Sequence, residues 1–222
     1  MYYLSVIKGA IEKPEGTYLT VLVPKEKIVN KIIRYKVDDV INIEIRIDDG
    51  RRITNDQRKK YFATLKDICD YLGHPADYMD KLFRLKYCLM SGIEKISMSD
   101  CSVTQAREMI NIIMDYAIEE GVPLVELGAL RTDEIDRFIY MCIASRKCCV
   151  CGKERADLHH ALEDKVGMGR DRTKIIHVGL LAITLCREHH NQVDNYDEKA
   201  FYEKHHIYPI KLDENLVRLL GI

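Results

Sequence analysis

The sequence predicts an α+β fold: a β-rich and then helical N-terminal domain, residues 1–130, followed by a small module of two strands and a helix within residues 131–222. Three patterns predict it. Residues 1–50 contain runs of β-branched and aromatic residues bounded by glycine and proline. Residues 54–142 contain apolar residues at helical spacing. After residue 148, two short apolar runs alternate with closely spaced cysteines and histidines, which is typical of a small metal-stapled module.

The N-terminal strands are expected from composition and alternation. Residues 2–7 and 17–23 are rich in tyrosine, valine, isoleucine and threonine, the residues that favour strands. Residues 40–47 alternate apolar and polar side chains with a period of two, which fits a half-buried strand. The Asp-Asp-Gly sequence at 48–50 predicts a turn after it.

Four helices are expected next, at about 54–72, 75–91, 102–120 and 132–142. Thr54 and Gln57 have the spacing of a capping box, and Gly73 predicts the end of that helix. Each helix has an apolar stripe expected to face the core. The stripes are Tyr61, Leu65, Ile68 and Leu72 in the first helix, Tyr78, Leu82, Leu85 and Leu89 in the second, Ile110, Ile113, Met114 and Ala117 in the third, and Ile135, Phe138, Ile139 and Cys142 in the fourth.

The C-terminal module is expected to contain a short strand near 157–160 and a second strand at 180–185. A glycine-rich, charged loop separates the two strands. Helices are predicted at 187–195 and 197–205.

Composition limits the class of protein. The 222 residues are enough for one large or two small domains, and 47% hydrophobic with 31% charged residues is typical of a globular protein. No apolar run approaches the roughly 18 residues of a membrane span, and no secretory signal is recognisable, so we expect a cytoplasmic protein without a membrane partner. The eight cysteines are then expected to be free thiols or metal ligands. The net charge of −1 does not by itself predict nucleic acid as a partner.

Two ligand pairs predict a structural zinc site. Cys148-x-x-Cys151 and Cys186-x-x-His189 each have the two-residue gap that lets both side chains of a knuckle reach one ion. Four protein ligands complete a tetrahedral site, so this Zn²⁺ would hold the fold and take no part in chemistry. The alternative is a group of reduced core cysteines beside a surface histidine.

A second set of histidines is interleaved with the zinc ligands. His159 and His160 end the first strand of the module, and His190 follows the zinc ligand His189. Neighbouring residues of an extended strand point to opposite faces, so one histidine of the pair can bind a metal while the other faces a substrate. On a helix, His189 and His190 project about 100° apart, so His190 can turn towards a different site.

The order Cys-x-x-Cys, Leu-His-His and Leu-Cys-x-x-His-His over residues 146–195 resembles the zinc-stapled form of the HNH (ββα-metal) endonucleases, in particular the HNHc nucleases of phages. The resemblance implies a DNA endonuclease that hydrolyses phosphodiesters to a 5′-phosphate and a 3′-hydroxyl. By position, it makes His159 and His190 ligands of a catalytic Mg²⁺ or Mn²⁺, and Asp194 can add a third. It makes His160 the general base, a role that suits an imidazole with an ordinary pKa near ~6.5.

One position departs from the family pattern. The central asparagine, which in the family fixes the loop that carries the base, corresponds to Leu181, whose side chain cannot form a hydrogen bond. His177 is a candidate substitute, and an inactive HNH fold that keeps its zinc is the alternative. In the loop between the two strands, Arg170, Arg172 and Lys174 are candidates for contacts to DNA phosphates, although a solvated charged loop has the same composition.

The first 130 residues resemble the lambdoid-phage Orf (NinB) recombination mediators in element order and in the short stretches 53–60 and 119–124. This resemblance implies a homodimer that binds single-stranded DNA and the host single-strand-binding protein, in the cytoplasm of a bacterial host. Branched DNA is a further candidate partner of the whole protein. The leading hypothesis is a phage DNA endonuclease linked to recombination. A non-catalytic, single-stranded-DNA-binding mediator with a structural zinc module is the alternative, and a protein-binding adaptor with a zinc ribbon is a third.

Overall fold

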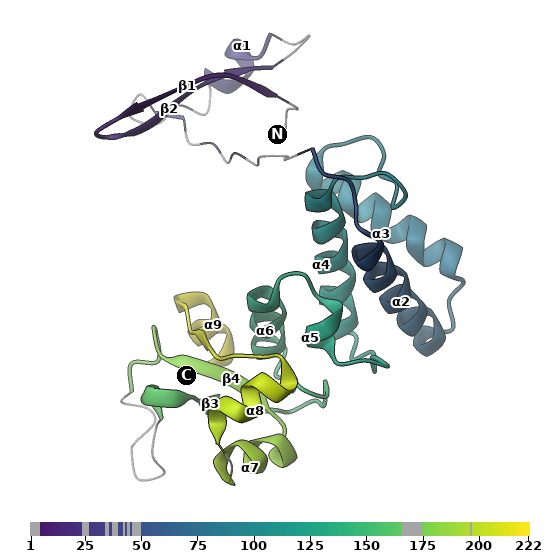
Figure 1. Cartoon of the computed structure of the whole chain (residues 1–222), viewed down its shortest axis with the longest axis vertical. Coiled ribbons are helices and arrows are strands. Elements are labelled where there is room, and N and C mark those ends of the chain that lie inside the picture. Colours follow the sequence, from purple (N-terminus) through teal and green to yellow (C-terminus); the bar gives the residue numbers. More distant parts are fainter. Residues whose placement is uncertain are drawn as a thin grey trace.

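The computed structural model describes residues 5–23, 27–33, 36, 40–41, 43, 45, 50–165, 175–195 and 197–222. Within these residues the chain is a mixture of helices and small sheets, which confirms the predicted α+β class (Figure 1). None of the described helices is both long and apolar enough to cross a membrane.

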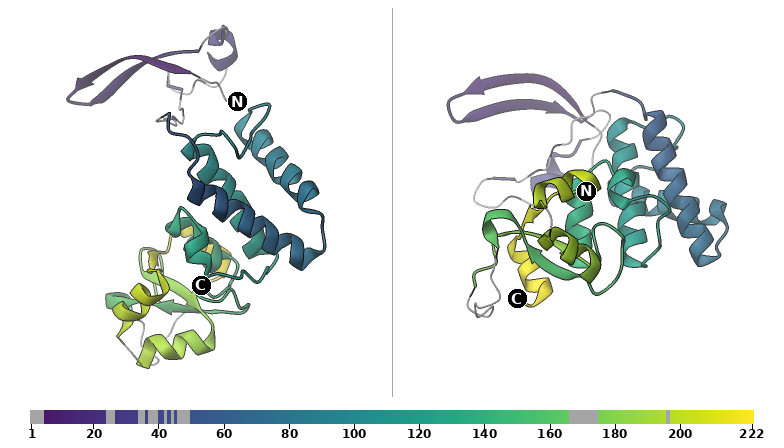
Figure 2. Two further views of the ribbon diagram at one scale, coloured as in Figure 1. Left: turned by 45° about the vertical axis from the view of Figure 1, so that its right-hand side comes forward. Right: turned by 60° about the horizontal axis from the view of Figure 1, so that its bottom comes forward.

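The N-terminal part forms a two-stranded antiparallel hairpin, β1 (Val6–Lys13) and β2 (Gly16–Leu22), followed by the short helix α1 (Val29–Ile32). In Figures 1 and 2 the hairpin lies away from the larger helices. All the residues of its two strands are exposed. The strands expected at 2–7 and 17–23 are therefore both present, and the first lies several residues further towards the C-terminus than expected. The strand expected at 40–47 falls largely outside the described residues.

Three long helices form the middle of the chain: α2 (Asn55–Leu72), α3 (Ala76–Ser91) and α4 (Val103–Glu119). Thr54 and Gln57 form the predicted capping box, and Ser102 and Gln105 form a second one at the start of α4. Helix α4 packs against α2 and α3 and buries Ile110 completely. The predicted order and bounds of these helices are confirmed.

The predicted inward face of α3 is wrong. Tyr78, Leu82, Leu85 and Leu89 are exposed, whereas Met79, Phe83 and Tyr87 are buried. Helix α3 is apolar on two sides, and helical periodicity identifies both stripes without deciding between them. Tertiary packing decides, because the stripe with Phe83 faces the core shared with α2 and α4.

Two shorter helices connect this bundle to the C-terminal module: α5 (Gly128–Arg131) and α6 (Ile135–Ala144). Helix α6 contacts α4 on one side and the sheet of the module on the other, and it buries Phe138, Ile139 and Cys142. The boundary predicted between residues 130 and 131 falls at the end of α5. One cluster of buried side chains runs from Ile53 to Leu216, so α6 links the cores of the two regions.

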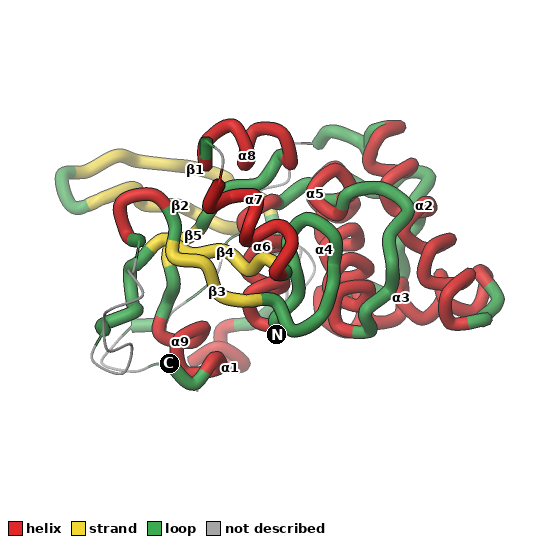
Figure 3. Tube along the Cα trace, turned by 90° about the horizontal axis from the view of Figure 1, so that it is seen from below, coloured by secondary structure: helices red, strands yellow, loops and turns green. Residues whose placement is uncertain are grey.

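The module is built on a three-stranded antiparallel sheet in the order β3 (Asp157–His160), β4 (Leu181–Leu185) and β5 (Ile210–Lys211). A 3-10 turn, η2 (Leu162–Asp164), follows β3. Helices α7 (Arg187–Asn195), α8 (Glu198–His205) and α9 (Glu214–Leu220) complete it. Figure 3 shows α6 and α7 beside the strands, in agreement with their contacts to β4. Strands β3 and β4 and helices α7 and α8 were predicted; β5 and α9 were not.

Candidate metal and catalytic centre

The four predicted zinc ligands Cys148, Cys151, Cys186 and His189 form one cluster, with all ligand atoms within 4.8 Å of one another. The Nδ1 atom of His189 lies 3.1 Å from Cys186 Sγ and 3.5 Å from Cys148 Sγ, and Cys151 Sγ lies 3.8 Å from Cys186 Sγ. Two sulfurs bound tetrahedrally at ~2.3 Å from zinc lie roughly 3.8 Å apart. The spacing of the donor atoms therefore fits a tetrahedral Zn²⁺ site.

The backbone holds the first pair of ligands in a tight knuckle. The Gly152 amide donates to the Cys148 carbonyl over 2.8 Å, and the Cys148 amide donates to the Lys153 carbonyl over 2.9 Å. Gly152 has a φ of +69°, a conformation that favours glycine. The second pair comes from the end of β4 and the first turn of α7, so a bound ion would tie the knuckle to the helix.

Burial affects the Cys148 thiol of this cluster. It raises the pKa of Cys148 to about 12, even though backbone amides partly offset it. Thiolate is the metal-binding form, so a divalent cation at this position would supply the positive charge that offsets the burial. Four of the five cysteines outside the cluster were expected to be buried thiols. None of them forms a disulfide; Cys69, Cys101 and Cys142 are buried, and Cys88 is partly buried.

A second cluster joins His159 of β3 to His190 and Asp194 of α7, with ligand atoms within 4.8 Å of one another. His159 Nδ1 lies 3.3 Å from His190 Nε2, and His190 Nδ1 lies 2.9 Å from Asp194 Oδ2. Two ligands at about 2.1 Å from an octahedral cation lie roughly 3.0 Å apart. The facing imidazole nitrogens are thus suitably spaced to share a small divalent cation.

Glu198 at the start of α8 contacts this second cluster, and the sequence reasoning missed it. Its Oε1 lies 3.3 Å from His159 Nε2 and accepts hydrogen bonds from Leu162 N (3.0 Å) and the Tyr202 hydroxyl (2.8 Å). Its Oε2 pairs with Lys165 Nζ at 2.8 Å. Its four-residue spacing from Asp194 is a signal in the sequence, but Glu198 lies 39 residues beyond His159, the side chain that it contacts.

The electrostatics of these buried groups favour a neutral imidazole beside an ionised carboxylate. Burial lowers the pKa of His159, and the Glu198 carboxylate only partly counteracts this. Burial alone would raise the pKa of Glu198, but the hydrogen bonds from Lys165, Leu162, Tyr202 and His159 together lower it to about 2. A neutral imidazole is the form that binds a metal.

His160 turns away from this cluster. Its Nε2 lies 3.0 Å from Nδ1 of His177, which is buried, and the two rings are 5.0 Å apart. Alternation along β3 explains the separation, because His159 pairs with Ile183 and His160 with Ala182 on successive register positions. The two histidines therefore have separate partners.

Leu181 links the two strands through its backbone. Its amide donates to Asp164 Oδ2 over 2.8 Å, and its carbonyl accepts from Ala161 N over 2.9 Å. These bonds hold the turn after His160 against the start of β4. The apolar side chain at this position does not remove the connection between the strands.

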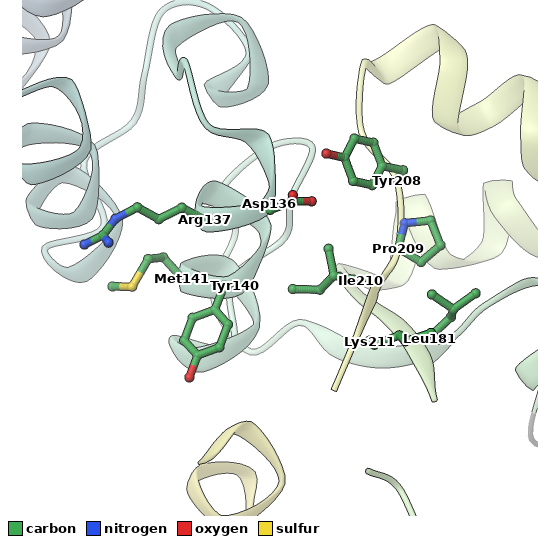
Figure 4. A pocket seen from close by; sticks show the side chains of 9 residues that line it. All are labelled: Asp136, Arg137, Tyr140, Met141, Leu181, Tyr208, Pro209, Ile210 and Lys211. Carbon is green, nitrogen blue, oxygen red and sulfur yellow. The ribbon is translucent and has the colours of Figure 1, made fainter. Parts of the chain in front are cut away.

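The remaining predicted site residues, Arg170, Arg172 and Lys174, lie outside the described residues. A groove of about 650 Å³ runs between α6 and β5, with mostly apolar walls (Figure 4). Leu181, Ile210 and Lys211 line its strand side. Register places Ile210 two strands from His160, roughly 10 Å away, and the groove's lining includes none of the candidate metal ligands.

Comparison with known families gives one match. Residues 23–222 match the model of the family described as "Putative HNHc nuclease". No curated protein and no solved structure matches the chain. The match begins after β2 and covers all the described helices as well as the module. The resemblance of the first 130 residues to the Orf mediators stays a prediction.

Proposed function

Because the chain belongs to the HNHc nuclease family, we propose that it is a metal-dependent DNA endonuclease that hydrolyses phosphodiesters with a histidine general base. The observation that carries the proposal is the separation of two neighbouring side chains. His159 faces the cluster with His190 and Asp194, whereas His160 faces His177. This separation supports a cation site at His159 and proton transfer at His160.

His159, His190 and Asp194 would hold the catalytic cation, Mg²⁺ or Mn²⁺. Such an ion, when bound, neutralises charge on the scissile phosphate and stabilises the leaving oxygen. Two imidazoles and one carboxylate leave coordination positions for phosphate oxygens and water, unlike the complete set of four ligands at the zinc cluster. We therefore assign the two clusters different roles, Zn²⁺ for structure and the second cation for hydrolysis.

His160 would act as the base through its Nδ1 atom. Its Nε2 atom is engaged with His177 Nδ1, and a neutral imidazole holds one proton. When His160 donates from Nε2, its Nδ1 keeps the lone pair that takes a proton from the attacking water. His177 must then accept at Nδ1 and hold its own proton on Nε2. His177 is the positioning residue in this arrangement, in place of the family's asparagine.

The test is cleavage of supercoiled and branched DNA by the zinc-loaded protein in Mg²⁺ or Mn²⁺. The His160→Ala protein should lose cleavage by at least about 100-fold while keeping its zinc and its melting temperature. His74→Ala, which removes an exposed histidine on the loop between α2 and α3, is the matched control and should cut normally. Equal cutting by wild type and His160→Ala would reject the assignment.

A second candidate function is a non-catalytic mediator that binds single-stranded DNA, with the zinc module as a structural unit. Leu181 at the asparagine position favours it. This function predicts strand binding and annealing without cleavage in any divalent metal. Our proposal also includes a phage origin, a link to recombination and a cytoplasmic location. It includes a homodimer and the host single-strand-binding protein as a partner, and a sizing and binding study of the same preparation would test these two.

A further inference from the structure

We propose that Glu198 is a positioning residue for the catalytic cation: it binds the Nε2–H of His159 and thereby presents the Nδ1 lone pair to the cation site. The proposal rests on the proposed function, because it concerns the same metal cluster. It adds a residue from α8, outside the segment 146–195 that carries the motif.

The contacts of Glu198 define which nitrogen of His159 carries the proton. Its side chain is 11% exposed, and its two oxygens are surrounded by donors: Leu162 N, the Tyr202 hydroxyl and Lys165 Nζ. Such a carboxylate acts only as an acceptor. The His159 Nε2 atom, 3.3 Å from Oε1, is therefore the donor nitrogen, and the lone pair lies on Nδ1.

On the opposite ligand, His190 Nδ1 lies 2.9 Å from Asp194 Oδ2 without the alignment of a hydrogen bond, and His190 Nε2 faces His159 Nδ1 over 3.3 Å. When the His190 proton is on Nδ1, both facing nitrogens carry lone pairs, an arrangement that is repulsive unless a cation lies between them. Carboxylates behind metal-binding imidazoles fix the ring and raise its basicity, and their loss typically weakens metal binding by 10–100-fold.

Glu198 also holds the chain directly after the histidine pair. It accepts from the amide of Leu162, which has a φ of +56°, and it pairs with Lys165 at the end of the same turn. One carboxylate thus fixes the His159 ring and the turn that leaves β3. Tyr202, one helical turn further along α8, holds the carboxylate in place.

The experiment measures Mn²⁺ binding by the zinc-loaded full chain, from the electron paramagnetic resonance signal of free Mn²⁺. Five proteins are compared: wild type, His190→Ala, Glu198→Ala, Glu198→Gln and the control Glu203→Ala, which removes an exposed carboxylate from the same helix. His190→Ala should abolish binding, and Glu198→Ala should weaken it about 10–100-fold. Glu198→Gln, which keeps an acceptor oxygen without the charge, should lie between, and Glu203→Ala should equal wild type.

A spectroscopic readout separates positioning from simple structural support. Nitrogen-15 NMR of the histidine rings in the cation-free protein should show His159 with its proton on Nε2 in the wild type and a mixture of both tautomers in Glu198→Ala. If Glu198→Ala does not fold, Glu198→Gln decides, and its binding should still be weaker than wild type. Mn²⁺ binding by Glu198→Ala or a folded Glu198→Gln within twofold of wild type overturns the proposal.

These binding measurements distinguish a failure of the role proposed for Glu198 from a failure of the proposed endonuclease activity. If the binding order holds but no DNA is cut, the positioning role stands and the endonuclease does not. If His190→Ala binds Mn²⁺ as tightly as wild type, the cation site itself is wrong, and the role of Glu198 falls with it.

Discussion

His159 and His160 are neighbours on β3, yet their rings contact different elements. His159 Nδ1 lies 3.3 Å from His190 Nε2 on α7, and His160 Nε2 lies 3.0 Å from His177 Nδ1 before β4. A strand is the simplest structure that separates adjacent side chains in this way, because its side chains alternate between faces. The four residues of the Cys/His cluster flank these strands, with one pair before β3 and the other after β4.

The contact between His160 and His177 predicts that two substitutions of His177 lower the rate of DNA cleavage to different extents. His177→Ala removes the acceptor that orients the base and should lower the single-turnover rate of DNA cleavage by about 10–100-fold. His177→Asn offers an amide oxygen and should recover part of that loss. The pair of variants is compared with His74→Ala. Unchanged rates in His177→Ala would show that the ring is oriented by other groups.

Zinc removal should unfold the module. Cys186→Ser replaces a ligand that lies 3.1 Å from His189 Nδ1 and 3.8 Å from Cys151 Sγ. The binding free energy of a structural zinc is folding free energy, so the variant should lose its zinc and melt at a lower temperature. Zinc content and circular dichroism measure both effects. Cys69→Ser, a buried thiol of α2, is the control and should keep one zinc per chain; a full zinc content in Cys186→Ser would contradict the assignment.

The pKa of His159 predicts how stability depends on pH in the protein without the catalytic cation. Burial lowers this pKa, so between the folded value and the unfolded value of about 6.5 the unfolded chain binds more protons. The contribution of His159 to stability is complete above the unfolded pKa and decreases as the pH falls below it. Glu198, with a pKa of about 2, loses its contribution only at lower pH, below about 4.5.

Denaturant unfolding at pH 7.5 and pH 5.5 measures this dependence. His159→Asn should show a smaller loss of unfolding free energy between the two pH values than wild type does. If the unfolding free energies of wild type and His159→Asn depend on pH in the same way, burial of His159 does not link folding to proton binding.

The sequence was sufficient for features that local chemistry determines. The capping box at Thr54 predicted the start of a helix, and the two-residue gaps predicted the cluster of three cysteines and a histidine, because both depend on residues a few positions apart. The adjacent histidines His159 and His160 predicted two separate sites, because the backbone of a strand points neighbouring side chains to opposite faces.

Features that depend on distant packing were not predictable in this way. The buried face of α3 is set by its packing against α2 and α4, and periodicity alone did not decide between the buried stripe with Phe83 and the exposed stripe with Leu82 and Leu89. Glu198 reaches His159 only because the start of α8 lies near the end of β3, where Glu198 also contacts Leu162. Strand β5 has two residues, Ile210 and Lys211, too few to show alternation. In each case the missing information is which elements meet in space.

The junction between the helical bundle and the module gives the last prediction. Gly128 begins α5, and a Cβ atom added there would lie 2.6 Å from two ring atoms of Phe138 on α6. Phe138 is buried, so its ring cannot move aside without displacing α6, which also contacts β4. Alanine in a helix is favoured over glycine by about 1 kcal/mol, whereas overpacking a core costs roughly 1–3 kcal/mol.

The clash should outweigh the helix propensity, so Gly128→Ala should lower the melting temperature by several degrees, given roughly 2–4 °C per kcal/mol for a chain of this size. Gly9→Ala is the control, because its added Cβ would meet only Thr20 at 3.8 Å, an ordinary contact. Calorimetry measures both variants. A Gly128→Ala protein that melts at or above the wild-type temperature would show that α5 and α6 have room to separate, and that α6 does not couple the bundle rigidly to the sheet that holds His159 and His160.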